Sequence, residues 1–257
     1  MNRFGLSLFL VLCTLVSFAQ PALQVAYPDY QFLNFQNSFE RVKVASAKND
    51  QTIKKLFQDK NIKYPCTNIL YRAFKSTNDM ELWARNTMTD TFVLIKTYKI
   101  CALSGILGPK RYEGDKQVPE GFYFIEDFNP KSNYHLSMLL SYPNYSDRLT
   151  GNKENLGGDI YIHGKCMTVG CMPMTDEFIE EIYATCLTSR TNGELNIPVH
   201  IYPLRFTQKG LDYLGREYKN EESKHKFWVN LKRAYDYFEA THKILPVMYD
   251  EQGEYAF

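Results

Sequence analysis

Residues 162–171 read Ile-His-Gly-Lys-Cys-Met-Thr-Val-Gly-Cys, so one short segment holds a histidine, two glycines and two cysteines. The apolar residues before His163 predict a strand, and Gly164 lets the chain turn sharply after it. Seven residues separate His163 from Cys171, enough for a loop to return beside the strand end. Downstream, Thr175 and the acids that follow it predict the start of a helix. The segment therefore predicts an imidazole and a thiol side by side.

This pair suggests nucleophilic chemistry. A thiol reacts as the thiolate, and its ordinary pKa is about 8.5, so a neighbouring base activates it. We expect His163 to take the proton of Cys171 while the Gly164 carbonyl accepts a hydrogen bond from the other ring nitrogen. Gly170 permits unusual backbone dihedrals and leaves its N–H uncovered, so the N–H groups of Gly170 and Cys171 are candidates for an oxyanion hole. These parts predict acyl transfer through a thioester.

Composition excludes several other classes of protein. The 257 residues are 44% apolar and 15% aromatic, which is enough for a packed core and argues against disorder. Lys and Arg number 30 against 29 Asp and Glu. This balance excludes a strongly basic nucleic-acid binder and an acidic solvating chain.

The N-terminus predicts export. Arg3 precedes an almost wholly apolar run, and small residues at Ser17 and Ala19 suit a signal peptidase. We therefore predict a cleaved signal peptide over residues 1–19, with an uncleaved anchor as the alternative, and no later segment long enough to span a bilayer. Without Cys13, five cysteines remain. An odd number in an oxidising compartment leaves at least one free thiol, either a buried cysteine or a nucleophile.

The remaining pattern predicts helices at both ends of a strand-rich middle. Residues 20–37 read as irregular, and a long loop at 105–121 is typical of a functional loop. We predict four segments: the signal over 1–19, an N-terminal helical extension over 20–66, a catalytic domain over 67–206 and a C-terminal helical extension over 207–257. Helices are expected at 38–47, 51–60, from 175 to about 191 and 209–244, and strands at 68–75, 80–85, 92–100, 122–125, 135–140, 159–163 and 199–206.

The motif resembles the signature of the L,D-transpeptidases, the YkuD-type catalytic domain. The resemblance lies in His-Gly at 163–164, Thr-Val-Gly-Cys at 168–171 and Met-Thr-Asp at 174–176, and covers roughly residues 38–240. The short gap between His163 and Cys171, and Val169 in place of a second histidine, resemble the branch that includes the enzyme detaching the major outer-membrane lipoprotein from peptidoglycan. The resemblance implies an α+β fold with a β-rich L,D-transpeptidase-like core, flanking N-terminal helices and a long C-terminal helix.

It also implies roles for particular residues. Cys171 is the nucleophile, His163 the base, and Gly164 and Gly170 complete the catalytic set. The implied partners are peptidoglycan stem peptides and an amine acceptor from peptidoglycan or a wall-linked lipoprotein, in the periplasm or cell envelope, with no nucleic acid, cofactor or metal. The residues expected to contact substrate are Lys110, Arg111, Glu113 and Thr168. The three loop charges equally suit a solvated charged loop, and Thr168 equally suits a turn cap. Family members carry an arginine shortly after the cysteine, where this chain has Met172 and Pro173, so that role does not transfer.

Other interpretations of the same residues stay open. Cys166 and Cys171 are also candidates for a disulfide. With His163 and His200 they are candidates for zinc ligands, which would make the protein a non-catalytic wall-binding or zinc-stabilised module. The other cysteines, Cys66, Cys101 and Cys186, are expected in the core or in a disulfide.

Overall fold

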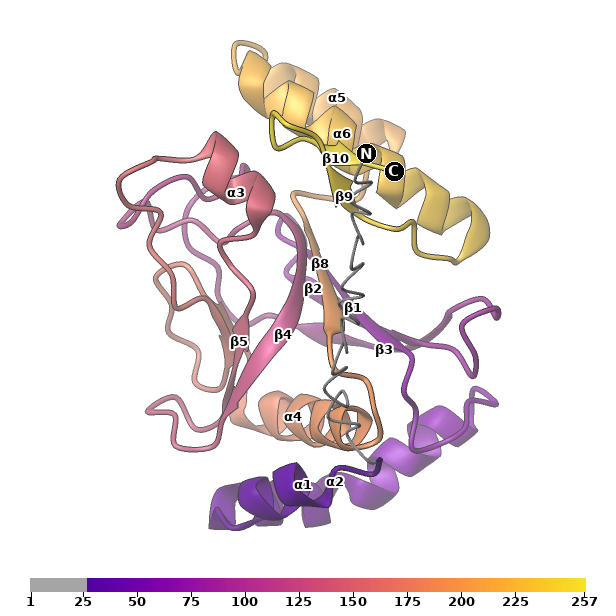
Figure 1. Ribbon diagram of the computed structural model, residues 1–257. Coiled ribbons are helices and arrows are strands. Elements are labelled where there is room, and N and C mark those ends of the chain that lie inside the picture. The colour runs from indigo at the N-terminus through magenta and orange to yellow at the C-terminus, as the bar shows by residue number, and fades with distance from the viewer. Residues whose placement is uncertain (1–26) are drawn as a thin grey trace, which may run out of the picture.

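An eight-stranded mixed sheet runs through the molecule in the order β3-β2-β1-β8-β4-β5-β6-β7 (Figure 1). This computed structural model describes residues 27–257, so the predicted signal peptide and Cys13 lie outside the described residues. The strands of this sheet are β1 (Ile69–Phe74), β2 (Asp79–Ala84), β3 (Val93–Lys99), β4 (Gly121–Asn129), β5 (Ser137–Leu140), β6 (Tyr161–His163), β7 (Met172–Pro173) and β8 (Ile197–Tyr202). The remaining elements are α1 (Tyr30–Asn37), α2 (Glu40–Gln58), α3 (Tyr145–Thr150), α4 (Asp176–Thr191), α5 (Gln208–Glu217), α6 (Glu222–Thr241) and a ribbon of β9 (Met248–Tyr249) and β10 (Tyr255–Ala256).

The central strands are covered on both faces. Strand β1 pairs with β2 antiparallel and with β8 in parallel, and all six of its residues are buried. Mostly apolar side chains are typical of a strand without a solvated face. Its one charged residue, Arg72, donates to the Glu239 carboxylate at 2.7 Å and lies over the Phe238 ring at 4.2 Å. The buried charge is therefore compensated.

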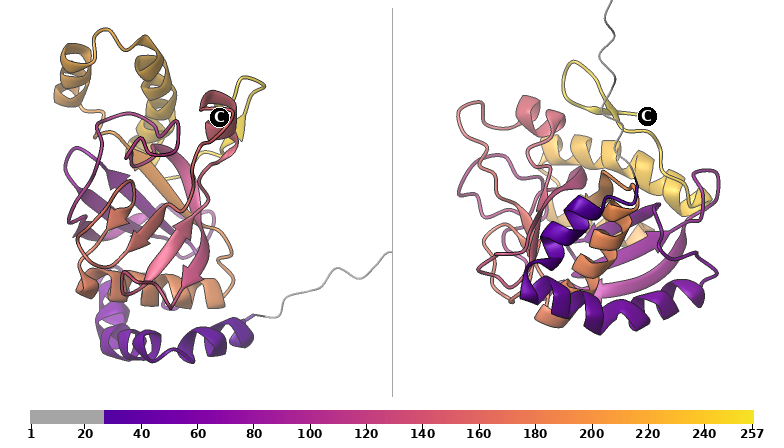
Figure 2. Two further views of the ribbon diagram at one scale, coloured as in Figure 1. Left: turned by 90° about the vertical axis from the view of Figure 1, so that its left-hand side faces the viewer. Right: turned by 60° about the horizontal axis from the view of Figure 1, so that its bottom comes forward.

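Two groups of helices lie on opposite sides of the sheet (Figures 1 and 2). Helices α1, α2 and α4 pack against the face that carries Tyr71, Tyr123 and Val199, and form the main core. Helix α6 packs Trp228 and Tyr235 against the opposite face in a second cluster. On that second face, β4 keeps exposed residues at positions 124, 126 and 127, so part of the face stays open to solvent.

These elements confirm the predicted α+β class, with a β-rich core between N- and C-terminal helices. The structure differs from the sequence prediction in several places: β4 continues to Asn129, and α3, β7 and the β9–β10 ribbon were not predicted. Three helical segments also differ. Residues 30–37 form helix α1, begun by Asp29, which accepts from the Phe32 N–H at 3.0 Å. The helices expected at 38–47 and 51–60 are one helix, because Asn49 donates to the Ala45 carbonyl at 2.9 Å within it. The C-terminal helix is interrupted between Glu217 and Glu222. The predicted segment boundaries remain predictions.

Candidate active site

A pocket of about 520 Å³ opens at the β5–β6 side of the sheet and holds both His163 and Cys171. Its other lining residues include Tyr134 from the loop before β5, and Asp159 and Tyr161 at the start of β6. The pocket therefore contains the imidazole and the thiol that the sequence predicts side by side.

Backbone pairing fixes the cysteine beside strand β6. Strand β7 follows Cys171 directly and runs parallel to β6, with Met172 opposite Ile162. The Tyr161 N–H donates to the Cys171 sulfur at 3.4 Å, and the thiol donates to the Asp159 carbonyl at 3.5 Å. Tyr161 and His163 are two residues apart on one strand and point to the same side of the sheet. Cys171 thus lies next to the residue that shares the face of His163.

The histidine is held as one tautomer. His163 Nδ1 lies 2.6 Å from the Gly164 carbonyl oxygen, as the sequence predicts. Because a carbonyl only accepts, Nδ1 carries the hydrogen and Nε2 is the basic nitrogen. The Tyr134 ring lies 4.7 Å from the imidazole and covers one side of it. Gly164 has no room for a side chain, because a Cβ there would lie 2.7 Å from Asp176 Oδ1 and 2.8 Å from the Tyr134 carbonyl.

A disulfide closes the loop that carries the cysteine. Cys101, after strand β3, is bonded to Cys166, between His163 and Cys171. The alternative of a Cys166–Cys171 disulfide is therefore wrong, and Cys171 is a free thiol that is not fully buried. Cys66 and Cys186 are also free and are buried, as expected for core cysteines.

Both backbone amides expected in the oxyanion hole already have acceptors. The Gly170 N–H donates to Ser104 Oγ at 2.7 Å, and the Cys171 N–H donates to Thr168 Oγ1 at 2.8 Å. The prediction of an uncovered Gly170 N–H is thus wrong, although its φ of +104° confirms the unusual dihedral. Thr168 also donates to the Cys171 carbonyl at 2.8 Å, so its hydroxyl closes the turn while the residue lines the pocket.

Burial keeps the resting pair neutral. It raises the pKa of the Cys171 thiol above its ordinary value, against the opposing effects of the Tyr161 N–H and Lys110. It lowers the pKa of His163, against the hydrogen bond with Gly164. Both shifts favour the uncharged form. The imidazole is therefore free to accept a proton at neutral pH, and the thiol retains its own until a reaction draws it away.

The charged residues of the long loop make contacts within the protein. Lys110 is buried, and its ammonium lies 2.6 Å from the Asp115 carboxylate. Arg111 lies 3.6 Å from Asp147, and Glu113 accepts from Asn155. None of the three lines the pocket that holds Cys171. We therefore leave the expected contacts of Lys110, Arg111 and Glu113 with substrate out of the proposed site.

The residues expected as zinc ligands, His163, Cys166, Cys171 and His200, do not all come together in the structure. Cys166 is in a disulfide and has no thiolate to offer. His200 lines a different cavity from His163 and Cys171. Across residues 27–257 no group of three or more His, Cys, Asp or Glu side chains is arranged to hold a metal ion.

Sequence reasoning missed three neighbours of the reactive pair. Tyr134 covers the imidazole, Asp159 holds the thiol through its carbonyl, and Ser104 occupies the Gly170 amide. Asp159 acts through its backbone, so its side-chain type carries no signal. Ser104 lies 66 residues before Gly170 along the chain. Ser104 lies three positions after Cys101. Its closeness to the motif loop could have been predicted only if the Cys101–Cys166 disulfide had been known.

A free thiol and a histidine held in one tautomer lie in the same pocket of a mixed sheet. This arrangement is that of a candidate cysteine acyl enzyme, the class that the sequence resembles. The model of the L,D-transpeptidase catalytic domain (YkuD) matches residues 74–201. The Escherichia coli K12 protein named "Putative L,D-transpeptidase YafK" is 35% identical over 177 residues, 68% of each chain, and its O157:H7 counterpart matches equally. This chain belongs to the L,D-transpeptidase family.

Solved structures with a similar arrangement come from two bacteria. The helical cell shape determining protein Pgp2 of Campylobacter jejuni is 17% identical, with a TM-score of 0.43 over 74% of this chain and 75% of that one. Its K307A mutant aligns over 54% of this chain and 48% of its own, with 20% identity and a TM-score of 0.42. Bd1075 of Bdellovibrio bacteriovorus is 16% identical, with a TM-score of 0.40 over 74% of this chain and 65% of that one.

Proposed function

We propose that this protein is a cysteine acyl enzyme of the cell envelope that acts on peptidoglycan stem peptides. The observation that carries the proposal is a free thiol at Cys171 in one pocket with the Nδ1-protonated imidazole of His163. Family membership supports peptidoglycan as the substrate class. The predicted signal peptide supports a place outside the cytoplasm, and in residues 27–257 no helix has the length and apolar character of a membrane span.

The proposed acylation begins with transfer of the Cys171 proton to His163 Nε2. The sulfur then attacks the carbonyl carbon of a diaminopimelate residue in the stem peptide, and a carbon–sulfur bond forms. The carbon–nitrogen bond breaks, and His163 gives its proton to the departing amine. The thioester retains the free energy of the acyl group, so the step needs no nucleotide.

The second half of the reaction determines the activity. An amine from peptidoglycan that attacks the thioester gives a transpeptidase. Water gives an amidase, and with a wall-linked lipoprotein as the departing amine it detaches the lipoprotein. Both outcomes share the acylation step and the residues Cys171 and His163. In both, the tetrahedral intermediate needs hydrogen bonds to its oxyanion.

The oxyanion would be held by the amides of Gly170 and Cys171. Their present acceptors are the hydroxyls of Ser104 and Thr168. Ser104 belongs to an irregular segment between β3 and β4, whereas Thr168 lies within the turn that it closes. We therefore expect the substrate oxygen to displace Ser104 Oγ from the Gly170 N–H, because an oxyanion is a stronger acceptor than a hydroxyl.

Digestion of peptidoglycan tests the proposal. Purified sacculi with and without bound lipoprotein are incubated with the protein, and the products are identified by mass spectrometry. We expect new peptide crosslinks for a transpeptidase, or free lipoprotein and unlinked stem peptides for an amidase. The matched control is Cys171→Ala, which removes only the sulfur. Unchanged sacculi with the folded wild-type protein would contradict the proposal.

A further inference from the structure

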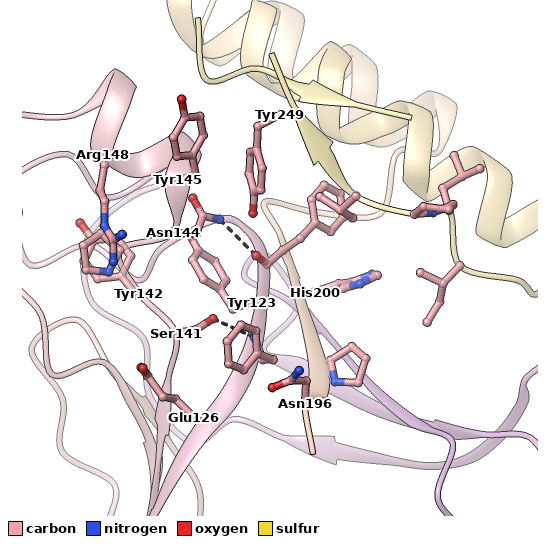
Figure 3. Close-up of a pocket in the computed structure, with 18 residues that line it drawn as sticks. Tyr123, Glu126, Ser141, Tyr142, Asn144, Tyr145, Arg148, Asn196, His200 and Tyr249 are labelled. Atoms are coloured by element: carbon pink, nitrogen blue, oxygen red, sulfur yellow. Dashed lines mark hydrogen bonds between the residues drawn. The ribbon is translucent and has the colours of Figure 1, made fainter. Parts of the chain in front are cut away.

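A second cavity, of about 580 Å³, is lined by β4, β8, the segment after β5 and the C-terminal segment (Figure 3). We call it the aromatic cavity. Figure 3 shows Tyr145 and Tyr249 at one end and Glu126 and Asn196 at the other, with His200 between β8 and the C-terminal segment. Residues 244–247 of that segment, Ile-Leu-Pro-Val, add apolar surface to its lining. Three parts of the chain far apart in sequence thus form one cavity.

The two cavities share one face of the sheet. Phe122 is paired with His200, and paired residues of antiparallel strands point to the same face. Further along β4 the register shifts between Ile125 and Asp127, and Glu126 and Asp127 are both exposed. This bulge keeps Phe122, Phe124 and Glu126 on the same face as Asn129, which lines the motif pocket. Strand β4 therefore contributes residues to both the aromatic cavity and the motif pocket.

His200 gives the aromatic cavity an unused hydrogen-bonding group. The residue is 6% exposed, and its ring packs edge-on against Phe122 at 4.8 Å. Neither ring nitrogen forms a hydrogen bond with residues 27–257, so both remain available to a ligand in the cavity that His200 lines. Burial lowers the pKa of His200 to about 3, so the ring is neutral and offers one donor and one acceptor. A ligand in the cavity could satisfy both.

The residues that line the aromatic cavity suit a neutral ligand with many hydroxyl groups. Its aromatic surfaces are open, with Phe124 37%, Tyr145 49% and Tyr249 36% exposed. The lining includes one carboxylate, Glu126, and one guanidinium, Arg148, and neither forms an ion pair within the described residues. With one acidic and one basic side chain, the lining favours neither an anionic nor a cationic ligand. Aromatic faces pack against the C–H face of a sugar ring, and polar side chains at the rim bind its hydroxyls.

We propose that the aromatic cavity binds N-acetylated sugar residues of a glycan strand. The apolar segment at 244–247 suits the acetyl methyl group, and His200 suits an amide or hydroxyl. As a site for the glycan of the substrate, the proposal rests on the proposed function. From Phe124, which lines the aromatic cavity, to Asn129, which lines the motif pocket, the strand spans about 17 Å.

The test is titration of an uncharged N-acetylglucosamine tetrasaccharide into the Cys171→Ala protein, followed by calorimetry and by NMR. We expect saturable binding, with affinity about tenfold lower in Tyr249→Ala and in Tyr145→Ala, because each change removes a stacking surface. The matched control is Tyr112→Ala, which removes an exposed tyrosine from the loop at 105–121, outside the cavity. It should bind as tightly as the parent.

The outcomes separate this proposal from the function of the motif pocket. No binding, or equal binding by the Tyr249→Ala and Tyr145→Ala variants, would overturn the glycan site even if Cys171 forms a thioester. Binding of a free stem peptide in the cavity in place of the sugar would also overturn it. Glycan binding without any reaction at Cys171 would support the glycan site and contradict the proposed function. In kinetics, Tyr249→Ala should raise KM for glycan-linked substrate more than for free stem peptide.

Discussion

The motif pocket and the aromatic cavity lie on the same sheet face, and each contains a buried histidine from a strand. In the motif pocket, His163 has its Nδ1 fixed by Gly164, and a free thiol lies in the same pocket. In the aromatic cavity, His200 has no partner in the described part of the chain and no cysteine near it. The first arrangement suits bond making, and the second suits recognition. The difference teaches that the surroundings of a histidine, more than its burial, determine its role.

The largest expected effect separates the two cavities by their chemistry. Cys171→Ala should abolish the covalent adduct with a carbapenem, a loss of at least about a thousandfold in rate, since no other thiol lines either cavity. Mass spectrometry of the intact protein measures the adduct. Cys186→Ala is the control, because burial raises the pKa of Cys186 to about 12 and keeps it unreactive. A persistent adduct in Cys171→Ala would contradict the assignment.

Replacement of His163 should sharpen the contrast. His163→Gln should slow the adduct by roughly 10²–10⁴-fold, the usual contribution of a general base. The lowered pKa of His163 keeps its basic form present down to pH values below about 6.5, so the wild-type rate should fall only below that pH. The rate of the His163→Gln variant should not show this fall at low pH. His225→Gln, on α6 and bonded to the Tyr218 carbonyl, is the control. An identical pH profile in His163→Gln would exclude the base.

The Cys101–Cys166 disulfide constrains the loop that carries Cys171 into the motif pocket. The double change Cys101→Ser and Cys166→Ser opens a link between residues 65 apart in sequence, which corresponds to about 4 kcal/mol of stability in the chain-entropy description. Chemical denaturation measures it, and the Cys171 adduct should form several-fold more slowly because the loop is less constrained. Reduction of the wild-type protein should reproduce both effects and leave the double variant unaffected. A faster adduct in the double variant would show that the loop is not positioned by this bond.

The smallest effect concerns pH and stability. The folded protein holds His200 neutral down to about pH 3, whereas the unfolded chain binds a proton near 6.5. The unfolded state therefore binds more protons below pH 6.5, and stability is lost as the pH falls. His200→Gln should reduce this acid loss by a few degrees in Tm between pH 7 and pH 4. His242→Gln, at the exposed end of α6, should leave the slope unchanged. Equal slopes in wild type and His200→Gln would refute the effect.

The sequence predicted the reactive pair because its parts lie close together in the chain. A strand end, a glycine and a returning loop constrain where His163 and Cys171 can lie, and only seven residues separate them. The strands from β1 to β6 were predicted from short apolar runs, some of them alternating, bounded by turn residues. Helix α1 was missed, since its aromatic and amide residues give a weak helical pattern, and α2 was divided because Asn49 reads equally as a cap.

Other features depended on chain segments that meet only in three dimensions. The choice of Cys101 as the partner of Cys166, and the hydroxyl of Ser104 on the Gly170 amide, join segments more than sixty residues apart. The loop charges were expected to contact substrate, but folding pairs Lys110 with Asp115 at 2.6 Å. Local pattern cannot select among several cysteines or acids as partners, because the selection follows from where the strands place them.

The sequence by itself predicted the class of protein, through the resemblance of its motif to a known family. It also predicted the two reactive side chains and the strand that presents them, because these follow from short-range spacing and periodicity. The tertiary structure alone decided which cysteines are bonded, which amides are occupied and that a second cavity shares the sheet face. The physical reason is that hydrogen bonds, burial and cavities arise between segments whose separation in the chain exceeds any local pattern. His163 and His200 look alike as strand histidines, and only their packed neighbours distinguish them.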